Sequence, residues 1–162
     1  MRALTFTVPK EWEQSKLKVF LRGYCNLSAR LLTKQKRVKM GLTINGEHGR
    51  ANDLLKTGDV VCVNLPDIEK DIEAVPLPLS IVYEDDDIIV INKDWCMPIY
   101  PTAGHDRDSL ANALFYHYQI HGVKLGFHPV YRLDKDTSGL IVIAKHGYAA
   151  AVLSKSIEKE YY

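Results

Sequence analysis

The densest cluster of chemically capable side chains lies near the C-terminal end of this 162-residue chain. It combines one guanidinium, two carboxylates, two aliphatic hydroxyls and a glycine in the run Tyr131-Arg132-Leu133-Asp134-Lys135-Asp136-Thr137-Ser138-Gly139. The Thr-Ser-Gly end favours a tight turn whose backbone and hydroxyls fix a neighbouring carboxylate. A carboxylate held in this way suits a nucleophile or a base. An ordinary surface turn with an Arg–Asp ion pair is the alternative that the residues alone leave open.

A second candidate site is a basic section near the N-terminus. Residues 15–50 contain nine bases and one acid, a net charge of +8, whereas residues 51–162 contain ten bases and 17 acids, a net charge of −7. Three cations, Arg30, Lys34 and Arg37, recur at helical spacing and are expected to share one helix face. This asymmetry predicts contact between the front of the chain and a polyanion, although a basic run is also common on a solvated face.

The basic section lies in a first predicted domain, residues 13–66. Apolar side chains at helical spacing predict a short amphipathic helix from Leu17 onward. Ser28 is suited to cap a second helix that runs through about Lys39. The signals that follow are a strand, a tight turn and a second strand, at residues 42–44, 45–46 and 60–63. We therefore expect two helices followed by a small sheet.

Residues 67–79 are acidic and then proline-punctuated, which predicts an extended linker between two domains. The second predicted domain is residues 80–162. Its expected elements are a buried strand at 88–91, a helix capped by Asp108 or Ser109, a buried strand at 139–144 and a helix at 148–157. Strands and helices that alternate in this way predict a mixed α/β or α+β class for the second domain. With the small first domain in front of it, we expect an α+β chain, and the family resemblance described next implies a mixed sheet in the second domain.

The run RLDKDTSGL resembles the signature H-R-L-D-x-x-T-S-G-L of the Rlu-type RNA pseudouridine synthases. Other landmarks of that family follow in order. YEDDDIIVINK resembles its first catalytic strand, MPIYPTAGHDRDSLANAL the loop and helix after it, and IEKEYY its K-x-Y element. The first domain is similar to the S-four-like RNA-binding domain, in the patterns LSARLLTKQKR, GLTINGE and LLKTGDVV. The resemblance thus covers nearly the whole chain.

The resemblance implies roles for three residues of the second domain. Asp134 aligns with the essential aspartate, which acts at the ribosyl centre of a flipped uridine while the base turns and rejoins through carbon 5. Arg132 aligns with an arginine that fills the gap left by that nucleotide, and Tyr161 with a tyrosine that stacks on the base. Flipping is required because the target atoms are hard to reach in a stacked helix. RNA contacts in the first domain are assigned to Arg30, Lys34, Lys36, Arg37 and Asn45.

The sequence departs from the family pattern at several places. Tyr131 and Tyr100 stand where the family usually has histidines, and Asp94 where it usually has proline. The family's catalytic domain also continues beyond the K-x-Y element, so the sequence predicts a domain truncated within its catalytic part. In such a domain we expect apolar strand residues, including Ile89 and Ile141, to lack neighbouring strands and to lose burial.

Three hypotheses for function follow. The first is an enzyme that isomerises uridine to pseudouridine in structured RNA, either rRNA or tRNA. The second is a non-catalytic RNA-binding fragment, because the catalytic domain is incomplete. The third, a hydrolase with Asp134 and Asp136 as paired carboxylates, is disfavoured because alternate positions in a turn seldom point at one substrate atom.

No cofactor or metal is expected. His117 and His121 lie four residues apart but without the carboxylate motif of a metal helix, and no glycine-rich phosphate loop is present. The chain has no run of about 20 apolar residues and no secretory h-region, which predicts no membrane partner. Three dispersed cysteines fit reduced thiols in a cytoplasmic protein. The full-length protein is expected to be a monomer.

Overall fold

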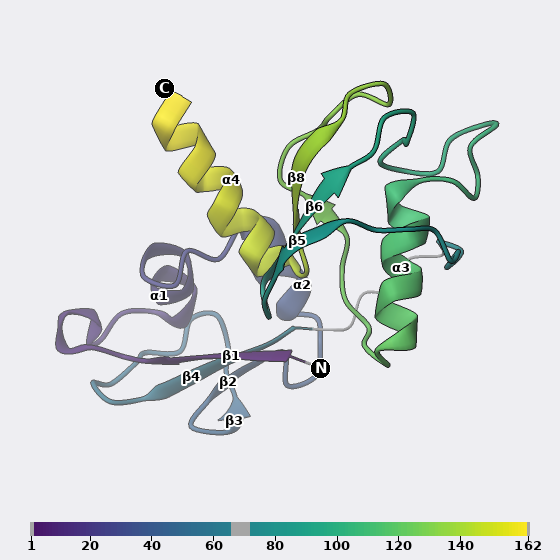
Figure 1. The fold of residues 1–162 in the computed structure, drawn as a ribbon. Coiled ribbons are helices and arrows are strands. Elements are labelled where there is room, and N and C mark those ends of the chain that lie inside the picture. Colours follow the sequence, from purple (N-terminus) through teal and green to yellow (C-terminus); the bar gives the residue numbers. More distant parts are fainter. Residues whose placement is uncertain (1, 66–71, 162) are drawn as a thin grey trace. The chain divides into compact units, whose positions relative to one another are not determined.

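The structure is a computed structural model that describes residues 2–65 and 72–161, with the side chains of residue 2 and of residues 159–161 outside the description. The chain divides into two compact units, Met1–Asp67 and Ile68–Tyr162 (Figure 1). Each described unit holds one four-stranded antiparallel sheet together with helices. This mixture confirms the predicted α+β class, but the described strands of the second sheet are all antiparallel, and not mixed as expected.

The first unit is built on a sheet of order β1-β4-β2-β3. Its strands are β1 (Arg2–Thr7), β2 (Leu42–Ile44), β3 (Glu47–His48) and β4 (Val60–Leu65). A 3-10 turn, η1 (Lys10–Trp12), and two short helices, α1 (Leu17–Gly23) and α2 (Ala29–Gln35), complete it. Burial of Leu17, Phe20 and Leu21 on α1, together with Val61 and Val63 on β4, forms its core. The alternation of buried and less buried residues along β4 is what a sheet with one covered face requires.

Strand β1 was not anticipated, and the first unit therefore begins ahead of the expected residue 13. β1 pairs along its whole length with β4, with Thr5 opposite Cys62. The signal was present in the sequence, since Leu4, Phe6 and Val8 alternate with exposed threonines. A period of two over six residues is the pattern of a half-covered strand.

Helix α2 begins where it was predicted and ends earlier. The Ser28 Oγ accepts a hydrogen bond from the Leu31 N–H at 3.1 Å, which confirms the cap. The helix stops at Gln35 rather than near Lys39. Beyond it the chain tightens, with the Val38 N–H donating to the Gln35 carbonyl at 3.1 Å in an i to i+3 contact of the kind that closes helix ends.

The second unit is built on a sheet of order β5-β6-β8-β7. Its elements are β5 (Ile81–Glu84), β6 (Ile88–Lys93), α3 (Leu110–Ile120), β7 (His128–Pro129), β8 (Gly139–Ala144) and α4 (Gly147–Tyr161). Ser109 caps α3 through a capping box with Asn112, as one of the two predicted caps. Leu110 and Leu114 of α3 pack with the sheet in one fully buried cluster.

The expected loss of burial in the second unit is wrong. Ile89 of β6 and Ile141 of β8 are both fully buried. Strand β8 is paired with β6 along its whole length, and at Ile143 and Ala144 it is also paired with β7 on its other side. The residues of α3 cover the apolar face that these strands share, which supplies the burial that the sequence could not locate.

Much of the predicted linker belongs to the second unit. Residues 66–71 lie outside the described part of the chain. Ile72 and Leu79 pack against the apolar cluster, and the Val75 N–H donates to the Asn112 carbonyl at 3.1 Å. The apolar side chains among the acids and prolines explain why this stretch packs rather than remaining extended in solvent.

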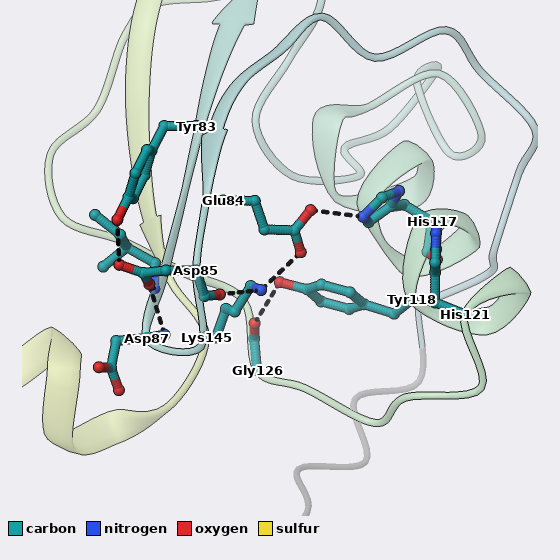
Figure 2. A network of polar contacts seen from close by, with 10 residues as sticks. Tyr83, Glu84, Asp85, Asp87, His117, Tyr118, His121, Gly126 and Lys145 are labelled. Atoms are coloured by element: carbon teal, nitrogen blue, oxygen red, sulfur yellow. Dashed lines mark hydrogen bonds and ion pairs between the residues drawn. The ribbon is translucent and has the colours of Figure 1, made fainter.

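A polar network ties β5 to α3 and to the end of β8 (Figure 2). One Glu84 oxygen lies 2.6 Å from the Lys145 Nζ, and the other lies 3.0 Å from the His117 Nε2. Beside them the Tyr118 hydroxyl donates to the Gly126 carbonyl at 3.3 Å. Burial disfavours the charged form of Glu84, but the hydrogen bonds and charges of Lys145 and His117 outweigh it and lower the pKa of this carboxyl.

Candidate active site and candidate RNA interface

The RLDKDTSG cluster forms the turn that joins β7 to β8, here called the motif turn (residues 130–138). The strands on each side position it. The Val130 N–H donates to the Val142 carbonyl at 3.0 Å, and the Tyr131 hydroxyl donates to the Leu140 carbonyl at 2.9 Å. Gly139 enters β8 at a φ of +138°, a conformation that side-chain-bearing residues rarely adopt. The glycine of the motif is therefore needed for backbone geometry.

Asp134 lies at the start of a tight bend within the motif turn. Its carbonyl accepts from the Thr137 N–H at 3.1 Å, which closes a turn in the predicted region. Among the described residues, the Thr137 and Ser138 hydroxyls make no hydrogen bond to a neighbouring carboxylate, so that part of the expectation is not met. The side chains of Arg132, Asp134, Lys135 and Asp136 are all exposed. Within the described part of the chain no ion pair joins Arg132 to Asp134. The arrangement thus differs from the simple surface pair that was the alternative interpretation, and it leaves the carboxylate open to a large substrate.

Buried Lys93, at the end of β6, holds the motif turn from beneath. The residue is 1% exposed, and its Nζ donates to the carbonyls of Asp94, Met97 and Lys135 at 3.0, 2.9 and 3.0 Å. Burial lowers the pKa of this ammonium, with the charges of Asp136 and Asp94 opposing. The three acceptors come from both sides of a long sequence gap, so one side chain fixes the motif turn against the start of the loop after β6.

That loop, here called the β6–α3 loop (residues 94–109), makes two further contacts with the motif turn. The Lys135 Nζ lies 2.9 Å from the His105 Nε2, and the His105 Nδ1 lies 2.6 Å from an Asp108 oxygen. The Cys96 Sγ lies 3.5 Å from an Asp136 oxygen. The motif turn is therefore one side of a polar interface, and the β6–α3 loop is the other. The sequence alone indicated no role for Lys93, His105 or Lys135.

Two tyrosines occupy the positions where the resemblance leads one to expect histidines. Tyr131 is held by its hydroxyl contact to β8, and the Tyr100 ring packs edge-on to Phe127 with centroids 5.0 Å apart. Burial raises the pKa of Tyr100, while the positive charge of Arg132 opposes that rise. Arg132 therefore lies close enough to Tyr100 for its positive charge to favour the ionised form of the phenol. The third predicted residue, Tyr161, ends α4, and its side chain lies outside the description.

Six cations of the first unit line two open hollows beside α1 and α2, together called the basic face. One hollow, of about 560 Å³, brings together the three predicted cations with Ala29, Thr33 and Val38; they are Arg30, Lys34 and Arg37. The other, of about 600 Å³, includes Lys36 with the α1 cations Lys18 and Arg22. The structure thus groups the predicted cations even though Arg37 lies beyond the end of α2.

Asn45 is used differently from the other predicted RNA contacts. It occupies the turn between β2 and β3 at a φ of 53°, followed by Gly46 at 84°, as a two-residue hairpin turn requires. Its amide nitrogen donates to Asp59 at 2.8 Å, and its amide oxygen accepts from the Val60 N–H at 2.8 Å. Its side chain is therefore already engaged in holding the turn to β4.

The part of the chain that contains the motif turn is similar in sequence to a known protein family. Residues 87–162, which contain the motif turn and the β6–α3 loop, match the family model described as RNA pseudouridylate synthase. This part of the chain therefore has the sequence pattern of the RNA pseudouridylate synthase family, in agreement with the resemblance found in the signature. No helix in the described residues is long and apolar enough to cross a membrane. Nor do those residues contain a group of three or more side chains placed to hold a metal ion.

Several relatives carry the same family name. The chain is 41% identical over 136 residues to the uncharacterized RNA pseudouridine synthase YjbO of Bacillus subtilis (strain 168), covering 83% of this chain and 48% of that protein. It is 34% identical to the uncharacterized RNA pseudouridine synthase YlyB of the same organism, covering 99% of this chain and 56% of that protein. The chain thus spans about half the length of these relatives, and the second similarity includes the first unit.

A further relative is named by its substrate. Over 89 residues the chain is 47% identical to ribosomal large subunit pseudouridine synthase D of Haemophilus influenzae, covering 54% of this chain and 27% of that protein. Among solved structures, human RNA pseudouridylate synthase domain containing 1 is 29% identical, with a TM-score of 0.41 over 51% of this chain and 28% of that chain.

Proposed function

We propose that this chain is part of an enzyme that converts uridine to pseudouridine in RNA, with Asp134 as its catalytic residue. The observation that carries the proposal is the motif turn itself. It has the family signature, it exposes Asp134, and it is fixed from beneath by Lys93. A carboxylate that is accessible but attached to a rigid turn can meet a substrate without first reorganising its own backbone.

The proposed reaction requires no external reactant. The Asp134 carboxylate attacks the ribosyl C1′ of a flipped uridine or assists departure of its base, and the bond between N1 and C1′ breaks. The base then turns so that C5 bonds to C1′, and where the carboxylate has attached to C1′ that bond breaks and the carboxylate is released. C5 finally loses its proton, and N1 gains one. Arg132 is proposed to occupy the gap in the RNA, and Tyr161 to stack on the base. The product has the same atoms as the substrate, so neither a metal nor a redox cofactor is part of the proposal.

The proposed substrate is structured ribosomal RNA, with transfer RNA as the alternative. The name of the Haemophilus influenzae relative supports the first choice. We further propose that the first unit, including residues 13–66, is an S-four-like RNA-binding domain whose basic face contacts phosphates. Six cations around two adjoining hollows supply the positive charge that such contacts need.

The proposal is tested by Asp134→Asn in the full-length protein. The substitution keeps the shape of the side chain but removes the charge and nucleophilicity, so pseudouridine formation should fall below detection. RNA affinity should stay within about threefold, since a single exposed carboxylate contributes little to binding a polyanion. Release of tritium from RNA labelled at carbon 5 of uridine measures turnover.

Asp136→Asn is the matched control, because it changes the other carboxylate of the same turn and should retain turnover. Turnover by Asp134→Asn at the wild-type rate would reject the role of Asp134. RNA binding without turnover by the wild-type full-length protein would instead support a protein that only binds RNA.

A further inference from the structure

Three side chains form a continuous polar chain between the β6–α3 loop and the motif turn. An Asp108 oxygen lies 2.6 Å from the His105 Nδ1, and the His105 Nε2 lies 2.9 Å from the Lys135 Nζ. The His105 side chain is 31% exposed and that of Asp108 is 53% exposed, so bulk protons reach both groups. Lys135 directly follows the proposed catalytic residue in the motif turn.

The chemistry of these three side chains fixes the protonation state in which their hydrogen bonds can form. An ammonium group donates hydrogen bonds and cannot accept one, so the His105 Nε2 must be the acceptor for Lys135. The single ring proton then lies on Nδ1, where it is donated to Asp108. Protonation of the ring would place a second N–H on Nε2, directly facing the Lys135 ammonium. The hydrogen bond would break, and two positive charges would face each other.

The position of Lys135 gives this contact a consequence for the site. Its carbonyl is held by Lys93 and its side chain by His105, so one residue is fixed at both its backbone and its tip. Loss of the His105 hydrogen bond leaves the backbone tether but frees the tip of the residue next to Asp134. Small displacements of a reacting group are sufficient to slow catalysis considerably.

We propose that His105 is a positioning residue whose neutral ring holds the motif turn against the β6–α3 loop, and that acidification releases it. The catalytic consequence rests on the proposed function, whereas the tether does not. The groups that face His105 are Asp108 on its own loop and Lys135 on the motif turn. Of the neighbouring charges, Arg107 is paired with Glu73 at 2.9 Å, and Asp136 is in contact with Cys96.

The first test follows the backbone of this 162-residue chain by NMR. The amide signals of residues 134–137 should shift when the sample is acidified from about pH 8 to about pH 5. In His105→Gln those shifts should disappear, because the amide oxygen takes the place of Nε2 as an acceptor and does not titrate. His121→Gln is the matched control, because the His121 ring contacts the His117 carbonyl of the adjoining helix α3 and not the motif turn. This variant should show the same amide shifts as the wild type. Identical shifts in wild type and His105→Gln would overturn the proposal.

The second test measures turnover of the full-length enzyme on saturating RNA. The wild-type kcat should fall roughly tenfold between about pH 8 and about pH 5, as expected for one misplaced reacting group. His105→Gln should keep its rate over this range, and His105→Ala should be slow throughout. An acid loss in His105→Gln equal to that of the wild type, or a fully active His105→Ala, would overturn the proposal.

The two tests separate the inference from the proposed function. If the wild-type full-length enzyme does not modify RNA, the proposed function fails, and the NMR titration still decides whether His105 holds the motif turn. If the enzyme is active but the amide signals of residues 134–137 do not respond to His105, the tether is rejected and the enzymatic assignment stands.

Discussion

Lys93 is a buried ammonium whose hydrogen bonds both satisfy its charge and hold the motif turn in place. Removing an ammonium from water is costly unless its donors are satisfied, and here all three of its protons have carbonyl acceptors. The sequence could not reveal this role, because the Lys135 carbonyl is 42 residues away. By contrast, the sequence alone could predict the turn that carries Asp134, because the side chains that favour a turn are its immediate neighbours.

We predict that Lys93→Met destabilises the second unit by about 1–3 kcal/mol, because it leaves three carbonyls without a donor in a buried place. Urea unfolding of the chain, followed by a probe in the second unit, measures the loss. Lys124→Met changes an exposed lysine and should stay within about 0.5 kcal/mol of the wild type. Equal stability of the two variants would show that the Lys93 hydrogen bonds contribute nothing.

At the scale of elements, the sequence was most informative where periodicity and caps agree. Helix α3 combined an apolar face with Ser109, and β8 was a continuous apolar run, so both were identified. The early end of α2 was not identified, since residues 36–40 contain no glycine or proline to mark it. The pairing of β8 with β6 and β7 was missed as well, because the pairing of strands from distant segments produces little signal in the local sequence.

The Glu84 network gives a prediction about pH. Because the pKa of Glu84 is lowered in the folded state, its contribution is complete above the ordinary carboxyl pKa and is lost as the pH falls through the lowered value. Glu84→Gln should therefore reduce the free energy of unfolding by about 1–3 kcal/mol near neutral pH. The difference from wild type should shrink below about pH 4.

Urea unfolding at about pH 7 and about pH 3 measures this difference. Glu158→Gln, which changes an exposed carboxylate of α4, is the control and should have little effect at either pH. A Glu84→Gln difference that persists unchanged in acid would contradict the assignment of the effect to the ionised carboxylate.

The basic face makes a prediction about salt. Replacing Arg30, Lys34 and Arg37 with alanine should weaken binding to every RNA sequence and lower the salt slope by about 2–3, at roughly 0.7–0.9 for each phosphate that is no longer neutralised. The control removes three exposed cations that line neither hollow, Lys10, Lys56 and Lys124. Titrations across salt concentrations in which both triple variants behave alike would indicate a general charge effect rather than a defined interface.

At the scale of the whole molecule, charge and fold divide at the same place. Residues 1–67 carry 12 bases and six acids, a net charge of +6, whereas residues 68–162 carry nine bases and 14 acids, a net charge of −5. The first unit has its own sheet and its own buried cluster on α1 and β4. Composition alone located this asymmetry, but only the structure showed that β1 belongs to the positive unit.

This division leads to the expectation that residues 1–67 fold alone and keep most of the RNA affinity. Long-range attraction to phosphates follows the net charge of the unit, and the negative second unit adds repulsion rather than attraction. A fragment of residues 1–67 should therefore bind RNA within about threefold of the whole chain and with the same salt slope. Residues 68–162 alone should bind at least about tenfold more weakly.

NMR signal dispersion establishes that each fragment is folded. A folded first fragment with a clearly smaller salt slope would show that phosphate contacts also come from the second unit, and a second fragment that binds as well as the first would refute the division.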